Sequence, residues 1–215
     1  MIPIASPFLG NEEINAVAKV IKSGMIAQGP RVNELENKFA NFCGAKYAVA
    51  VNNGTAALHT ALNAIGIKKG DEVITTPFSF IATANAILMQ GAKPIFVDIE
   101  EDTFNINPIK IKEKITKKTK AILTVDLYGH LCDYGEIEEI AKKNKLIIIE
   151  DACQAVGAEY KGKKAGNFGN LAAFSFYATK NITCGEGGAI TTNNNTYAEN
   201  SKLFRQHGRS SMSQY

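Results

Sequence analysis

The sequence predicts an α/β fold of three layers, in which a mostly parallel central sheet lies between helices. Short runs rich in β-forming residues alternate along the chain with longer segments whose apolar residues recur at helical spacing. The run KLIIIEDA at 145–152 is apolar almost without interruption, as a parallel strand covered on both faces requires. Four or five strand–helix units in succession are typical of a parallel sheet with helices on both sides.

Helices and strands are expected to follow one another in a regular order. Two helices, at 11–24 and 27–44, come before the sheet. The expected strands lie at 46–51, 71–76, 93–99, 120–129 and 145–152. The expected helices after the first four strands lie at 55–66, 79–91, 107–115 and 134–144. Glycine closes the first two of these helices and proline stands early in the third, which are positions that helices favour for these residues.

The composition excludes several classes of protein. With 45% hydrophobic and 21% charged residues, this chain of 215 residues can bury a sizeable core and is neither disordered nor collagen-like. A net charge of +3 is too small and too scattered to indicate nucleic acid or an anionic membrane as a partner. No apolar run approaches the ~18 residues of a membrane span, and the first residues lack the pattern of a signal peptide. The four cysteines are far apart, which disfavours a metal site or disulfides and predicts a reducing cytoplasm.

The segment NNGT at 52–55 lies where a phosphate is expected to bind. Ligands of open parallel sheets bind beyond the carboxyl ends of the strands, and this segment joins a strand to a helix. The start of a helix has free backbone N–H groups and the positive end of the helix dipole, and Gly54 lets a phosphate approach closely. Asn-Gly-Thr is also good turn and cap chemistry, so this segment alone leaves both interpretations open. It matches neither the Walker loop nor the dinucleotide fingerprint.

Aspartates follow three of the expected strands, in the segments DIEED, DLYGH and EDACQ. The last of these, with Glu150 and Asp151, ends the most apolar strand. A half-buried carboxylate is costly unless a cation or hydrogen-bond donors face it. Asp151 is therefore expected to face a positively charged partner, or, in the simpler alternative, to cap a following helix.

The stretch FSFYATKNITCGEGGAI at 174–190 places one lysine, Lys180, between an aromatic run and a cluster of glycines. The alternation of Phe174, Ser175 and Phe176 directs the serine to the face opposite its neighbours. The glycines are expected to leave room for a coenzyme and to lead into the next strand. A lysine amine attacks carbonyls to form Schiff bases, more readily where burial disfavours the ammonium form.

Together, the lysine, the carboxylate and the phosphate turn are what pyridoxal 5′-phosphate (PLP) requires. The lysine holds the aldehyde, and the turn holds the phosphate. The carboxylate keeps the pyridine nitrogen protonated, so that the ring accepts electrons. Each feature alone is unspecific, but their combination strongly favours PLP.

The sequence resembles the DegT/DnrJ/EryC1/StrS family of PLP-dependent sugar aminotransferases, in the fold-type I (aspartate aminotransferase-like) superfamily. The resemblance extends from IPIASPFLGNEEI to the end of the chain. The motifs that carry it are GPRVNELENKFA, NNGTAALHTAL, TPFSFIATANAI, DLYGH, IIEDACQAVGAEYKGKKAGNFGNLAAFSFYATKNITCGEGGAI and LFRQHG. So many motifs in one order make the resemblance specific.

The resemblance implies a role for each residue that matches the motifs. Lys180 would bind PLP covalently, and Asp151 would face the pyridine nitrogen. Gln154 would lie beside the ring hydroxyl, and Phe80 would stack on the ring.

For the phosphate, the resemblance implies Gly54 and Thr55, helped by the hydroxyl of Ser175. The chain departs from the family in the segment CDYG, where Gly135 replaces a common second aspartate. No role of that aspartate is therefore carried over to this chain.

The function implied by the resemblance is transfer of an amino group, with glutamate as the expected donor, to a nucleotide-linked keto-sugar by a homodimer. A related PLP-dependent sugar dehydratase is disfavoured, because those relatives resemble this fold with histidine in place of Lys180. A nucleotide-dependent oxidoreductase lacks its glycine fingerprint after the first strand. A non-catalytic PLP-binding protein stays open as an alternative.

Residues 1–215 are expected to form the PLP-binding large domain, with its N-terminal helices within 1–45. In the family pattern a smaller C-terminal domain follows. The chain is therefore expected to lack that domain and to turn over poorly by itself.

Overall fold

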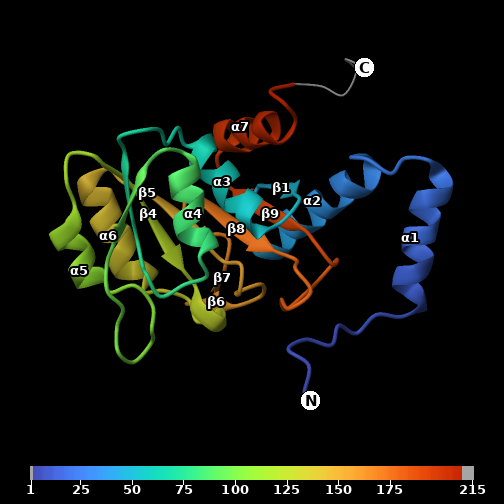
Figure 1. The fold of residues 1–215 in the computed structure, drawn as a ribbon, viewed down its shortest axis with the longest axis horizontal. Coiled ribbons are helices and arrows are strands. Elements are labelled where there is room, and N and C mark those ends of the chain that lie inside the picture. Colours follow the sequence, from blue (N-terminus) through green and yellow to red (C-terminus); the bar gives the residue numbers. More distant parts are fainter. Residues whose placement is uncertain (1, 210–215) are drawn as a thin grey trace.

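The computed structural model describes residues 2–209 and has the predicted α/β architecture (Figure 1). A seven-stranded sheet has the strand order β1-β9-β8-β5-β4-β2-β3. Its strands are β1 Tyr47–Val51, β2 Glu72–Thr75, β3 Lys93–Phe96, β4 Thr119–Val125, β5 Ile147–Asp151, β8 Leu171–Ser175 and β9 Gly188–Thr192. A separate two-stranded ribbon consists of β6 Glu159–Tyr160 and β7 Lys163–Lys164. Met1 and residues 210–215 of the predicted domain lie outside the described residues.

The sheet is mostly parallel, as predicted. The pairs β2–β3, β2–β4, β4–β5 and β5–β8 are parallel, whereas β9 is antiparallel to both β8 and β1. Because β9 is reversed relative to both neighbours, β1 runs in the same direction as β8 and β5. The carboxyl ends of β1, β5 and β8 therefore lie at the same edge of the sheet, where ligands of such folds bind.

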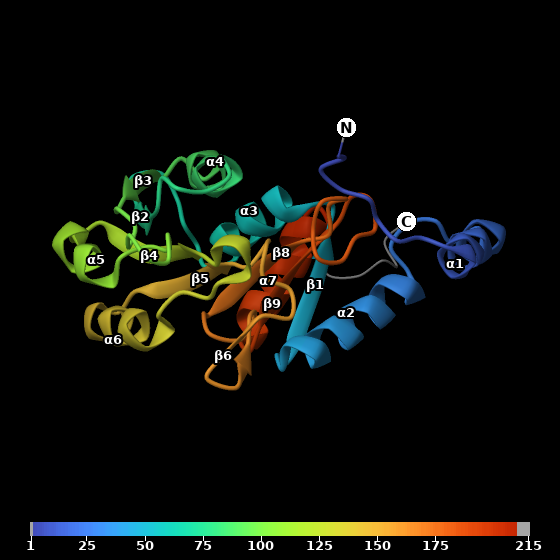
Figure 2. The ribbon, with the colours of Figure 1, turned by 90° about the horizontal axis from the view of Figure 1, so that it is seen from below.

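Helices cover both faces of the sheet (Figure 2). On one face lie α2 Pro30–Cys43, α5 Pro108–Lys114 and α6 Tyr134–Asn144, and on the other lie α3 Gly54–Ala64, α4 Ala82–Met89 and α7 Asn195–Arg205. The alternation of strand side chains supplies a core to each face: Ile148 belongs to the first core and Ile149 to the second. The three predicted layers are thus confirmed.

Two of the predicted elements are shorter than expected at the ends that face the candidate site. The helix expected from residue 79 begins at Ala82, so Ser79 and Phe80 lie in the loop after β2. The strand expected to reach residue 129 ends at Val125. A short 3₁₀ turn, Leu127–Gly129, follows it and turns the chain away from the sheet.

Helix α1, Asn11–Ser23, stands away from the sheet (Figures 1 and 2). None of its residues is buried within the described part of the chain. Its apolar residues Ile14, Val17 and Ile21 are 65%, 58% and 64% exposed. The helix is amphipathic, and no other part of the described chain buries its apolar face.

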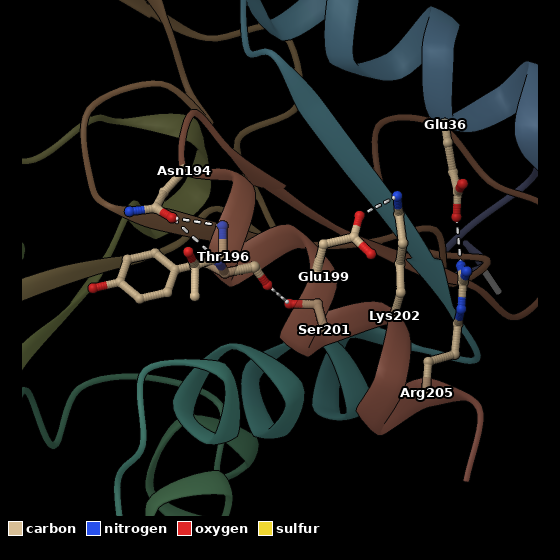
Figure 3. A network of polar contacts seen from close by, with 8 residues as sticks. Glu36, Asn194, Thr196, Glu199, Ser201, Lys202 and Arg205 are labelled. Atoms are coloured by element: carbon tan, nitrogen blue, oxygen red, sulfur yellow. Dashed lines mark hydrogen bonds and ion pairs between the residues drawn. The ribbon is translucent and has the colours of Figure 1, made fainter. Parts of the chain in front are cut away.

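A buried ion pair connects helices α2 and α7 beside the outer edge of strand β1 (Figure 3). Arg205 of α7 binds Glu36 of α2, and both side chains are only about one-tenth exposed. Arg205 Nη1 also donates to Ala50 O at 2.8 Å, and Glu36 Oε1 accepts from Ala50 N at 2.9 Å. These contacts give hydrogen-bond partners to the N–H and C=O groups of Ala50 on the outer edge of β1. Segment 52–55 follows directly after this strand.

Candidate active site

One cavity brings the predicted site residues together. It has a volume of about 380 Å³ and lies at the carboxyl ends of β1, β5 and β8. All the predicted residues line it: Gly54, Thr55, Phe80, Asp151, Gln154, Ser175 and Lys180. The other lining residues are Asn53, Leu58, Ser79, Ala82, Thr83, Cys153, Tyr177, Thr179 and Glu186.

The start of α3 forms one end of this cavity. Asn53 caps the helix, and its Oδ1 accepts a hydrogen bond from Ala56 N at 2.8 Å. The first N–H groups of a helix have no partner within it, and those of Gly54 and Thr55 belong to this first turn. A Cβ on residue 54 would lie only 2.8 Å from Ser175 Cβ. Glycine therefore lets the Ser175 hydroxyl lie beside the helix start, a combination suited to an anion.

Ser175 reaches the cavity because β8 alternates as predicted. Phe174 and Phe176 are buried on the opposite face. Both rings pack edge-on against Phe39 of α2, with centroids 4.9 and 5.2 Å from it. The two phenylalanines anchor the end of the strand and leave Ser175 on the side of α3.

Asp151, at the end of β5, is the buried carboxylate of the cavity and is 6% exposed. Its Oδ2 accepts from Thr83 Oγ1 at 2.8 Å, and its Oδ1 accepts from Cys153 N at 3.3 Å. Burial raises the pKa of Asp151, whereas the bonds from Thr83 and Cys153 and the charge of Lys180 lower it. The chain between Asp151 and β6 forms turns, so the alternative of a helix cap is wrong.

Lys180 lies in the loop after β8 and is half-buried. A turn holds its backbone, in which Lys180 N donates to Tyr177 O at 2.9 Å. Its charge acts on Asp151, and both residues line the same cavity. A primary amine and a buried carboxylate thus share one cavity, as the sequence predicted.

Gln154 presents a hydrogen-bond donor to the cavity. Tyr128 N donates to Gln154 Oε1 at 2.8 Å. A backbone N–H can only donate, so this bond fixes the oxygen of the amide on Tyr128. The amide NH₂ is left for an acceptor oxygen in the cavity.

Phe80 lies in the loop between β2 and α4, lines the cavity and is 69% exposed. A flat, accessible ring at a cavity wall is suited to cover one face of an aromatic ligand. Stacking on a ring therefore stays a prediction for Phe80, and its position agrees with that prediction.

The expectation that the glycine cluster leaves room for a coenzyme was wrong for Gly187 and Gly188. A Cβ on Gly187 would lie 2.5 Å from Cys184 Sγ, and one on Gly188 would lie 2.5 Å from Asn53 O. The chain itself fills the space that these glycines leave. They do lead into the next strand, β9, as predicted.

The aspartates of the other two strand-end segments lie outside the cavity lining. Asp98 is exposed and forms an ion pair with Lys110 at 3.1 Å. Asp126 is buried with Glu150 on the α6 face of the sheet, where Tyr134 OH donates to its Oδ1 at 2.9 Å. Only Asp151 points toward α3 and α4, because neighbouring strand residues face opposite sides.

The described residues show neither a metal cluster nor a membrane span. No three histidine, cysteine, aspartate or glutamate side chains gather as metal ligands in residues 2–209. Within the same residues, none of the helices is long and apolar enough to cross a membrane. All four cysteines have free thiols, and Cys153 lines the cavity.

Comparison with protein families identifies the chain. The model of the DegT/DnrJ/EryC1/StrS aminotransferase family matches residues 7–215. The chain belongs to this family. The resemblance stated from its motifs is confirmed.

Curated relatives of this family member share about half of its residues. An uncharacterized protein of Methanocaldococcus jannaschii is 51% identical over 207 residues, which are 96% of this chain and 54% of that protein. The GDP-perosamine synthase of Caulobacter vibrioides is 46% identical over 208 residues, which are 96% of this chain and 56% of that protein. The chain therefore spans a little over half the length of these relatives.

Solved structures share the fold. The aminotransferase from Psychrobacter cryohalolentis superimposes with a TM-score of 0.93 and 40% identity, over 98% of this chain and 55% of that one. Spr1654 from Streptococcus pneumoniae, in its PLP form, has a TM-score of 0.93 and 31% identity, over 98% of this chain and 59% of that one. These similarities confirm the predicted fold class.

The residues in the cavity of this DegT/DnrJ/EryC1/StrS family member fit PLP. The start of α3, which a Cβ on Gly54 would crowd, suits the phosphate. Asp151 would supply a carboxylate to face the protonated pyridine nitrogen, and Lys180 would supply an amine for the aldehyde. The NH₂ of Gln154 suits the ring hydroxyl oxygen. The donor set thus matches the cofactor group by group.

Several lining residues were not predicted from the sequence. Thr83 and Ser79 form a hydroxyl pair behind Asp151, and Tyr177 and Glu186 lie around the Lys180 loop. Thr83 is the second residue of α4, one of the polar residues in an otherwise apolar helix. A hydroxyl in this mostly apolar segment was the only signal in the sequence.

Proposed function

We propose that this protein is a PLP-dependent aminotransferase that moves an amino group, with glutamate as donor, to a nucleotide-linked keto-sugar. The observation that carries the proposal is the convergence of Lys180, Asp151 and the start of α3 on one cavity. Membership of an aminotransferase family supports the reaction class. The similarity to GDP-perosamine synthase supports a nucleotide-linked sugar as the acceptor.

Lys180 and Asp151 carry the chemistry in this proposal. When bound, PLP supplies an aldehyde that takes up an amino group and a ring that accepts electrons. Lys180 would hold the cofactor at its aldehyde, and its amine would move a proton at the substrate carbon. The negative charge of Asp151 would keep a proton on the pyridine nitrogen.

The other lining residues hold the cofactor in place. The backbone N–H groups of Gly54 and Thr55 and the hydroxyl of Ser175 would hold the phosphate. The NH₂ of Gln154 would donate to the ring hydroxyl oxygen, since its amide oxygen accepts from Tyr128 N, and Phe80 would cover one face of the ring.

The amino donor can be tested without the sugar. The visible spectrum of the purified protein with PLP is recorded before and after addition of L-glutamate. We expect glutamate to convert the spectrum of lysine-bound PLP to that of pyridoxamine phosphate, and Lys180→Ala to show no such change. A spectrum that changes only with another amino acid would replace glutamate as donor. A spectrum that no amino donor changes would favour a non-catalytic PLP-binding protein.

The acceptor is then identified with a panel of nucleotide-linked keto-sugars. The true acceptor should restore the first spectrum of the glutamate-treated protein and yield an aminated sugar detectable by mass spectrometry. Formation of a deoxygenated rather than an aminated sugar would support the dehydratase alternative instead.

We also propose that the protein forms a homodimer through α1. The exposed apolar stripe of Ile14, Val17 and Ile21 supports this proposal, since a second copy would remove it from water. Sedimentation equilibrium should give the mass of two chains for the wild type and of one chain for Val17→Asp. A wild type that stays monomeric at all concentrations would contradict the proposal.

Two other expectations stay predictions. One is the assignment of residues 1–215 to a PLP-binding large domain, and the other is a cytoplasmic location.

A further inference from the structure

Two hydroxyl groups form a hydrogen-bonded chain that ends at the Asp151 carboxylate. Thr83 Oγ1 lies 2.8 Å from Asp151 Oδ2, and Ser79 Oγ lies 2.7 Å from Thr83 Oγ1. Thr83 is 1% exposed, and Ser79 is half-buried. Ser79 lies in the loop between β2 and α4, and Thr83 lies in the first turn of α4, whereas Asp151 ends β5. The hydroxyl pair therefore connects two separate elements of the fold.

While Asp151 is ionised, the hydrogen atoms of this hydrogen-bonded chain have one arrangement. Thr83 has a single hydroxyl hydrogen and donates it to the carboxylate. The contact between the two hydroxyl groups must then be donated by Ser79. Hydrogen bonds in such a chain polarise one another, so Ser79 strengthens the bond from Thr83 to Asp151.

The other carboxylate oxygen has its own donor. Cys153 N donates to Asp151 Oδ1 at 3.3 Å, which is a longer bond than the one from Thr83. The threonine side chain is stiff at χ1 because of its branched Cβ. The shorter of the two contacts is thus the one from Thr83, whose χ1 is restricted, and it helps to fix the plane of the carboxylate.

We propose that Thr83, backed by Ser79, is a positioning residue that orients the Asp151 carboxylate and holds it in its ionised form. The inference rests on the proposed function, in which Asp151 faces the pyridine nitrogen of PLP. Neither hydroxyl needs to touch the reacting atoms. Because Ser79 precedes Phe80, the same hydrogen bonds also connect the loop that contains Phe80 with the Asp151 carboxylate.

The electrostatic surroundings agree with this role. The groups that act on Asp151 are Thr83 from α4, the thiol and N–H of Cys153 beyond β5, Lys180 from the loop after β8, and Asp126 beyond β4. Burial raises the pKa of Asp151, and the bond from Thr83 is the largest opposing contribution. Without the bond from Thr83, the effect of burial on the pKa of Asp151 is opposed less, so this carboxyl should keep its proton up to a higher pH.

The test is a pH titration of the Asp151 carboxyl carbon by ¹³C NMR in the protein without PLP, with the signal assigned by its loss in Asp151→Asn. Thr83→Val keeps the shape and removes the hydroxyl. We expect it to move the titration midpoint upward by about one pH unit or more, as the loss of one hydrogen bond to a charged group implies. Ser79→Ala should move it in the same direction by less, and Thr83→Ser should restore it.

Thr60→Val is the matched control, because Thr60 is a buried helix threonine away from the cavity lining. It should leave the midpoint unchanged. An unchanged midpoint in Thr83→Val, or equal midpoints in Thr83→Val and Thr83→Ser, would overturn the proposal. If Thr83→Val does not fold, Ser79→Ala decides: an upward shift supports the proposal, and a wild-type midpoint overturns it.

The titration separates this inference from the proposed function because it needs no cofactor. If Thr83→Val shifts the midpoint but the protein binds no PLP, the role of Thr83 toward Asp151 stands and the proposed PLP-dependent function is wrong. A wild-type midpoint in Thr83→Val, with PLP bound at Lys180, would reject the inference alone. In the PLP-loaded protein, the pH midpoint of the visible spectrum should also shift in Thr83→Val and be restored by Thr83→Ser.

Discussion

Gly54 packs so closely against Ser175 that a Cβ on residue 54 would lie 2.8 Å from Ser175 Cβ. This contact brings the start of α3 against the end of β8. It also places the free N–H groups of a helix beside a hydroxyl, although these residues are far apart in the sequence. The proposed phosphate site depends on this one close approach.

Gly54→Ala should therefore affect both folding and binding. The added methyl group would also lie 2.9 Å from Cys153 Sγ, so buried Ser175 and half-buried Cys153 must both shift. We expect the free energy of unfolding in urea to fall by about 1–3 kcal/mol, and the affinity for PLP to fall with it. Gly29→Ala is the control, because its Cβ would meet nothing nearer than 3.8 Å. Equal stability and PLP affinity in the two variants would contradict the account of Gly54.

Asp126 should make stability depend on pH. It is fully buried; Cys132 N and Tyr134 OH donate to its Oδ1, while Oδ2 has no partner among the described residues. Burial, and next the nearby Glu150, raise the pKa of Asp126 well above the usual 3.8. The folded protein thus holds this proton more tightly than the unfolded chain does. The contribution of Asp126 to stability therefore falls as the pH rises above its usual pKa.

Asp126→Asn keeps an acceptor at Oδ1 and removes the titration. We expect its stability relative to the wild type to increase by about 1–3 kcal/mol between about pH 4 and pH 8, measured by urea unfolding. Asp98→Asn is the contrasting control, since the exposed ion pair with Lys110 lowers the pKa of Asp98. That control should show no gain with rising pH. A pH-independent difference for Asp126→Asn would contradict the prediction.

The ion pair between Glu36 and Arg205 should stabilise the edge of the sheet. Arg205→Met leaves the Glu36 carboxylate buried beside Ala50 without its cation. We expect a loss of about 2–4 kcal/mol in the free energy of unfolding.

The neighbouring pair of Lys202 and Glu199 provides the control (Figure 3), because their side chains are 41% and 53% exposed. Lys202→Met should cost less than about 1 kcal/mol. A similar loss in both variants would mean that burial does not distinguish the two pairs.

Asp151→Asn should separate cofactor binding from amino transfer. The phosphate contacts and Lys180 remain, so we expect PLP still to bind. Without the negative charge, the pyridine nitrogen loses its proton, and amino transfer from glutamate should fall by about 100-fold or more. Asp98→Asn should transfer at the wild-type rate, because its side chain is exposed and lies outside the cavity lining. Near-normal transfer by Asp151→Asn would make this carboxylate a structural group only.

The parts of the fold that the sequence predicts are those set by local patterns. The apolar run that became β5 and the alternation around Ser175 are examples, since burial on one or both faces imposes its own periodicity. The position of β1 at the edge beside β9 was not predicted, because it depends on pairing between distant segments. Local patterns identify the strands themselves but not their neighbours in the sheet.

The candidate site shows the same division. Gly54, Asp151 and Lys180 were predicted because each residue type suits one group of the cofactor. The contact between Thr83 and Asp151 was not, since it depends on how α4 packs over the end of β5. Gly187 and Gly188 were assigned to the coenzyme although they make room for the chain itself, a distinction that only packing reveals.

Borohydride reduction tests most directly whether Lys180 holds PLP. Reduction makes the bond between the lysine and the cofactor permanent, and peptide mass mapping then locates the pyridoxyl group. We predict that this group lies on the peptide with Lys180 and that Lys180→Ala loses it. Labelling mainly at another lysine, such as the exposed Lys163 or its neighbour Lys164, would contradict the account.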